Sequence, residues 1–94
     1  MEMEIIWSET ALNSFLSTVD YLFEKWSIKE INSFESKVDD LLETLLANNE
    51  LCPESKIFGY RKCSIDGINS LVYSIVNNKL FLVTFLDNRS SNLF

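Results

Sequence analysis

A short basic segment, Gly59-Tyr60-Arg61-Lys62, carries side chains that are well suited to bind a partner. Alternate side chains of a strand point to opposite faces, so Tyr60 and Lys62 would share one face and Arg61 would lie on the other. An arginine guanidinium can hold a phosphate or a carboxylate through two parallel hydrogen bonds. The alternative is a structural role, in which Arg61 lies exposed at a sheet edge or pairs with Asp87. The sequence favours neither reading.

A second polar cluster, Asp87-Asn88-Arg89, follows the last apolar run of the chain, where it can orient an arginine. Tyr73 lies within another apolar run, which favours a core residue with a hydrogen-bonded hydroxyl over a catalytic acid. The neighbouring carboxylates of Asp39 and Asp40 would point in different directions on a helix, so we do not expect them to form an acid–base pair.

Several kinds of active site are excluded by residues that the sequence lacks. It contains no histidine, which rules out Ser-His and Cys-His enzymes and argues against a structural zinc site. Neither Gly59 nor Gly67 belongs to a phosphate-binding loop. Cys52 and Cys63 lie eleven positions apart outside any paired motif, so we expect ordinary reduced thiols. We expect no metal and no cofactor.

The first half of the chain predicts a strand and two helices. The strand covers Glu4 to Trp7, and Ser8 is a suitable N-cap for the first helix. That helix is predicted from apolar residues at three- and four-residue spacing, namely Ala11, Leu12, Phe15, Leu16, Val19, Leu22, Phe23 and Trp26. Ser27 and Glu30 form a capping-box pattern that starts a second amphipathic helix almost without a loop, so an antiparallel hairpin is expected.

The second half predicts three strands, over residues 56–65, 71–76 and 79–86. Asp66-Gly67 and Asn77-Asn78 are the turns between them, and asparagine tolerates the positive φ of a tight hairpin. The last strand is apolar on both faces, so it should be central and covered on both sides. The helices would cover one face, and either the C-terminal segment or a partner would cover the other. Together these elements predict one α+β domain over residues 1–94, in the order β-α-α-β-β-β, with a helical hairpin on a small antiparallel sheet.

The charge is distributed unevenly along the chain. Residues 1–50 hold eleven acidic residues and three lysines, a net charge of -8, whereas residues 51–94 hold five basic and three acidic residues, a net charge of +2. The acidic total of -6 argues against nonspecific wrapping of nucleic acid. For the acidic helices, a solvated outer surface is favoured over an acidic binding site. The N-terminal residues are acidic where a signal peptide would be basic, so we expect a cytoplasmic protein.

The order of elements and the motifs together resemble the RelE/ParE superfamily of toxins from type II toxin–antitoxin systems. The resemblance is carried by Ile5-Ile6-Trp7-Ser8 with Ala11 and Tyr21, by Tyr60-Arg61-Lys62, by Leu71-Val72-Tyr73-Ser74-Ile75 and by Phe85-Leu86-Asp87-Asn88-Arg89. It covers nearly the whole chain. It implies the superfamily's β-α-α-β-β-β fold and a cognate antitoxin as partner, with which the toxin forms a hetero-oligomer.

Two branches of this superfamily imply different targets. RelE-like members cleave mRNA on the ribosome with basic residues and a late tyrosine or histidine, whereas ParE-like members inhibit DNA gyrase. The resemblance places basic residues at Arg61 and Arg89, and residues 90–94 offer no late acid–base group, so the ParE-like branch is favoured and no enzymatic activity is expected. The alternatives are a RelE-like endonuclease and a non-toxic module that only binds its antitoxin. The residues expected to bind partners are Tyr60, Arg61, Lys62, Asp87, Arg89, Leu93 and Phe94.

Overall fold

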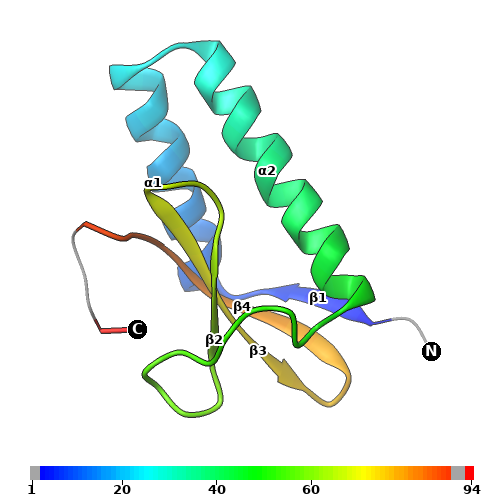
Figure 1. Cartoon of the computed structure of the whole chain (residues 1–94). Coiled ribbons are helices and arrows are strands. Elements are labelled where there is room, and N and C mark those ends of the chain that lie inside the picture. Colours follow the sequence, from blue (N-terminus) through cyan, green and yellow to red (C-terminus); the bar gives the residue numbers. More distant parts are fainter. Residues whose placement is uncertain (1–2, 90–92) are drawn as a thin grey trace.

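A computed structural model of the chain describes residues 3–89 and 93–94 and shows an α+β domain (Figure 1). Its elements follow the predicted order β-α-α-β-β-β. They are β1 (Glu4–Trp7), α1 (Glu9–Lys25), α2 (Ile28–Ala47), β2 (Arg61–Ser64), β3 (Asn69–Val76) and β4 (Lys79–Asp87). The two helices form the predicted hairpin, and α1 packs on β4. No helix of the described residues is long and apolar enough to cross a bilayer.

Local capping signals define both helices as the sequence predicted. The Ser8 hydroxyl accepts a hydrogen bond from the Ala11 N–H at 2.9 Å and so caps the first turn of α1. The Glu30 carboxylate accepts from the Ser27 N–H at 3.2 Å, which forms the capping box of α2. The C-cap of α2 is Asn48, whose N–H donates to the Thr44 carbonyl at 2.8 Å.

The sheet is mixed, with the strand order β1-β4-β3-β2. Strands β2, β3 and β4 form the predicted antiparallel meander, and Asn77 and Asn78 take φ values of 50° and 60° in its tight turn. Strand β1 instead pairs in parallel with β4, from Glu4 opposite Lys79 to Trp7 opposite Leu82. The sequence correctly predicted the strand but not this pairing, which joins residues more than seventy positions apart.

The strand predicted over residues 56–65 is wrong in its first half. Regular pairing begins only at Arg61, and the chain before it turns back on itself. The Ser55 N–H donates to the Tyr60 carbonyl at 2.8 Å, and Gly59 takes a φ of 89°, which disfavours side-chain-bearing residues there. This closed loop uses the backbone groups that a longer strand would need for its ladder.

The last strand is central, as predicted, because β4 lies between β1 and β3. It is not covered equally on both sides, however. Leu80, Leu82 and Phe85 are buried, whereas Phe81 on the opposite face remains 36% exposed. The helices cover one face of the sheet, and Phe81 lies on the other face.

An aromatic cluster joins the helices to the sheet. The Phe15 ring lies 5.6 Å from the Phe34 ring and 5.4 Å from the Phe85 ring, between centroids, and Trp7 stacks on Phe85 at 5.5 Å. The Phe85 N–H donates to the Ser14 hydroxyl at 2.9 Å, which fixes α1 against β4. This contact lies two residues before Asp87, one of the predicted binding residues.

Candidate partner-binding site

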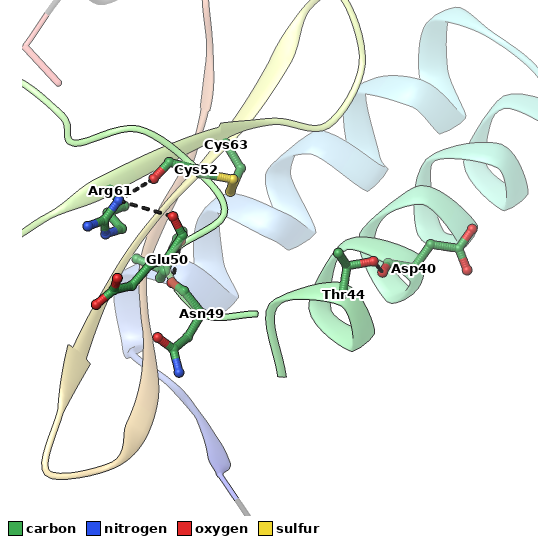
Figure 2. The surroundings of a disulfide bond; sticks show 8 residues. Asp40, Thr44, Asn49, Glu50, Cys52, Arg61 and Cys63 are labelled. Atoms are coloured by element: carbon green, nitrogen blue, oxygen red, sulfur yellow. Dashed lines mark hydrogen bonds between the residues drawn. A yellow bond between two sulfur atoms is a disulfide. The ribbon is translucent and has the colours of Figure 1, made fainter. Parts of the chain in front are cut away.

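Arg61 begins β2, and its side chain is held by backbone carbonyls (Figure 2). Its Nη1 donates to the Cys52 carbonyl at 2.6 Å and to the Glu50 carbonyl at 3.3 Å. Arg61 is half-buried, and it does not pair with Asp87 as one structural reading proposed. One edge of the guanidinium is therefore fixed in place, so the side chain is oriented before any partner arrives.

A disulfide bond joins Cys52 and Cys63 beside this arginine, so the prediction of two reduced thiols is wrong. The segment after α2 runs back along β2, where the Lys62 N–H donates to the Pro53 carbonyl at 3.1 Å and Glu54 forms a bridge with Arg61. This brings the two cysteine Cα atoms to 5.3 Å, a separation that suits a disulfide. Their sequence spacing alone carried no sign of it, because the contact depends on the path of the loop.

Tyr73 lies opposite Arg61 in the β2–β3 ladder, and like Arg61 it holds the backbone that follows α2. Tyr73 is fully buried, and its hydroxyl donates to the Asn49 carbonyl at 2.8 Å, which confirms the predicted core role. Burial raises the pKa of the Tyr73 phenol above its ordinary value. Tyr73 therefore stays protonated at neutral pH and acts as a structural donor.

Tyr60 and Phe94 are brought together in the structure. Their ring centroids lie 6.2 Å apart in a stacked arrangement, and the Lys56 N–H donates to the Phe94 carbonyl at 3.0 Å. Phe58, in the same loop, is 100% exposed, although its sequence position did not mark it as a candidate binding residue. An exposed aromatic next to Gly59 could have been noticed as a loop-tip residue. The result is an apolar surface beside the basic residues of β2.

Asp87 and Arg89 form the predicted polar cluster at the end of β4. The Arg89 Nε and Nη2 donate to the two carboxylate oxygens of Asp87 at 3.0 and 2.7 Å. These hydrogen bonds lower the pKa of Asp87 to about 2, and they raise that of Arg89. The pair is solvent-accessible, so its contribution to stability is small, but it fixes the direction of the arginine.

The predicted binding residues fall into two separate places. Arg61 lies opposite Tyr73, whereas Asp87 lies opposite Asn69, four positions away along β3. At about 3.3 Å per residue this is a separation of roughly 13 Å along the strand. Leu93 is exposed, and the next residue, Phe94, stacks on Tyr60. The structure thus brings Tyr60 and Phe94 together, and Asp87 and Arg89 together, but not the two pairs.

A pocket of about 410 Å³ opens at the Arg89 end, and the sequence did not indicate it. It lies between the two helices and the turn before β3, with Tyr21, Trp26, Lys37 and Asp66 among its lining residues. Burial would raise the pKa of Asp66, but hydrogen bonds from the N–H groups of Asn69 and Ile68 outweigh it and lower that pKa. No group of three or more metal-ligating side chains occurs within residues 3–89 and 93–94.

No family model matches the sequence, and no curated protein matches it either. Solved structures do match it. A chain of the chromosomal ParDE system from P. aeruginosa has a TM-score of 0.78 and 11% identity, with 92% of this chain and 96% of that chain covered. The YoeB/ParE toxin from Agrobacterium tumefaciens has a TM-score of 0.69 and 12% identity, over 92% and 99%. A chain of the E. coli DinJ–YafQ toxin–antitoxin complex has a TM-score of 0.64 and 16% identity, over 100% and 99%. The chain therefore has the RelE/ParE-like fold that its sequence predicted.

Proposed function

We propose that this chain is the toxin of a type II toxin–antitoxin pair, held inactive in the cytoplasm by a cognate antitoxin. The single observation that carries the proposal is the fold, which recurs over almost the full length of toxin chains from separate systems. The DinJ–YafQ chain was solved within a toxin–antitoxin complex, which supports a hetero-oligomer here too.

Within this proposal, DNA gyrase is the favoured target and binding is the favoured mode of action. The side chains near Arg61 are poor acid–base catalysts, since Tyr73 is buried with its hydroxyl on the Asn49 carbonyl and Arg61 Nη1 is held by carbonyls. The sequence also has no histidine. The proposed contacts with the target are the oriented arginines, Arg61 and Arg89, with Tyr60, Lys62, Asp87 and the C-terminal Leu93 and Phe94.

A supercoiling assay with purified gyrase tests this mode of action. The chain should inhibit supercoiling, and Arg61→Ala and Arg89→Ala should each weaken the inhibition about tenfold, as expected for a charged interface contact. Lys79→Ala is the matched control, because Lys79 is an exposed cation next to the Asn77-Asn78 turn and is not one of the proposed contacts. Equal inhibition by folded arginine variants and the wild type would refute these assignments.

A ribosome-dependent mRNA endonuclease is the second candidate. The exposed Phe58 and the Tyr60–Phe94 pair lie on the part of the chain that carries Lys56 and Lys62, and aromatic rings among cations can stack single-stranded bases. Cleaved mRNA on ribosomes, with normal gyrase activity, would favour this candidate. Antitoxin binding with neither effect would indicate a non-toxic binding module.

A further inference from the structure

One side of α1 presents an apolar surface that the fold leaves open. Leu12 and Leu16 are 47% and 49% exposed, and Phe23 is 69% exposed. At 3.6 residues per turn these side chains fall within an arc of about 40° and extend along three turns, roughly 16 Å. We call Leu12, Leu16 and Phe23 the outer stripe. The inward face of the same helix consists of Ala11, Phe15 and Leu22.

Acidic side chains border the outer stripe on one side. At the same helical periodicity, Glu9, Asp20 and Glu24 occupy the arc next to it, and all of them are exposed. Within residues 3–89 and 93–94, none of these carboxylates forms an ion pair with a basic side chain. The lysine of this helix, Lys25, falls on the far side of the helix from the outer stripe. The outer stripe and its acidic border therefore complement a surface that has an apolar stripe with a basic border.

We infer that the outer stripe of α1 is the docking surface for an amphipathic helix of a partner protein, with lysine or arginine along one border of its apolar face. A helix fits because a ridge of side chains on one helix packs into the groove between the ridges of another over several turns. The inference rests on the proposed function and deepens it. The partner helix would then belong to the antitoxin, and the toxin-binding segment of the antitoxin would be basic. The surface chemistry does not depend on toxicity.

The other occupants fit less well. A second copy docked two-fold and antiparallel through the stripe would place the acidic border of one copy against that of the other, and like charges repel. An anionic membrane surface would be repelled by the same carboxylates. A basic helix is the occupant whose charge complements both the stripe's border and the net charge of -6.

Matched synthetic peptides test the inference on the full chain. Two 18-residue helical peptides carry the same leucine face, with lysine in one and glutamate in the other at the bordering positions. By fluorescence anisotropy at about 50 mM salt, the lysine peptide should bind at least about tenfold more tightly, and the difference should shrink at about 300 mM. Leu16→Ser with Phe23→Ser should remove binding of the lysine peptide. Equal affinities for the two peptides would overturn the inference.

Charge-reversal variants separate a specific site from general attraction to an acidic protein. Asp20→Lys with Glu24→Lys should reverse the preference toward the glutamate peptide. Asp40→Lys with Glu43→Lys makes the same change in net charge on the exposed side of α2, where Figure 2 shows the Asp40 carboxylate pointing away from the other helix. That control should keep the lysine preference. If the two charge-reversal variants show the same peptide preference, the inference is wrong. It is also wrong if sedimentation shows a dimer of the chain that dissociates on Leu16→Ser with Phe23→Ser. Because toxicity is not measured, these outcomes are distinct from failure of the proposed function.

Discussion

At the scale of single residues, the molecule uses its few strong polar side chains to fix geometry. Arg61 and Tyr73 hold the backbone that follows α2, and Asp87 holds Arg89. The sequence indicated that Asp87 can orient Arg89, but the main-chain carbonyls that hold Arg61 and Tyr73 come within reach only through the fold. Their roles can therefore be tested one side chain at a time.

The ion pair at the end of β4 predicts a pH-dependent contribution to stability. The folded pKa of Asp87 is about 2, below the ordinary 3.8, so the contribution is present above about pH 4 and is lost as the pH falls toward 2. Arg89→Ala should return the Asp87 pKa toward its ordinary value in a carboxyl-carbon NMR titration. Arg61→Ala should leave it unchanged, because Arg61 contacts other groups. A pKa still near 2 without Arg89 would contradict this origin.

The buried hydroxyl of Tyr73 predicts a loss of stability on its removal. Tyr73→Phe keeps the ring but leaves the Asn49 carbonyl without its donor, which should lower the free energy of unfolding by about 1 kcal/mol in urea denaturation. Tyr60→Phe is the matched control and should change little, because Tyr60 is half-buried and its ring, which the substitution keeps, stacks on Phe94. Equal losses in the two variants would argue against a specific hydrogen bond.

At the scale of elements, the helix starts and the tight hairpin turn were predicted correctly from local signals, whereas the first half of the strand predicted over residues 56–65 was wrong and the pairing of β1 was not predicted. The N-cap of α1, the capping box of α2 and the Asn77-Asn78 turn depend on neighbours a few positions away. The parallel pairing of β1 joins segments more than seventy positions apart, whereas the shortening of β2 and the Cys52–Cys63 bond depend on the path of the loop between them. For the same reason, the site residues were identified individually, but their division into two places was not.

The start of α1 gives a test at this scale. The Ser8 hydroxyl accepts from the Ala11 N–H and donates to the Val83 carbonyl at 3.0 Å, so it caps the helix and joins it to β4. Ser8→Ala should lower the free energy of unfolding by about 1 kcal/mol or more. Ser36→Ala, at an exposed position within α2, should have almost no effect in the same thermal or urea measurement. A neutral Ser8→Ala variant would contradict the cap.

The disulfide gives a second test. It closes a loop between residues 52 and 63, and loop-closure entropy for that length corresponds to about 3 kcal/mol. A dithiol reductant, or Cys52→Ser with Cys63→Ser, should lower the free energy of unfolding by about that amount and speed amide exchange over residues 53–60. Exchange in α1 should change less under native conditions. An unchanged midpoint in urea would show that the bond does not stabilise the fold.

At the scale of the whole molecule, charge and apolar surface are divided between the two halves of the chain. The helical half is acidic and carries the outer stripe, whereas the sheet half carries the basic residues around Arg61 and Arg89. In the account proposed here, an antitoxin helix occupies α1 while the target meets the ends of β2 and β4. The two surfaces are different, so variants of one should spare the other.

Induction of the chain in a bacterial host without its antitoxin, with labelled precursors for DNA and protein synthesis followed in parallel, tests the central claim most directly. The account predicts that growth stops and that DNA synthesis falls before protein synthesis. A fall in protein synthesis first would move the target to the ribosome. Unimpaired growth at high levels of folded protein would contradict the claim that this chain is a toxin.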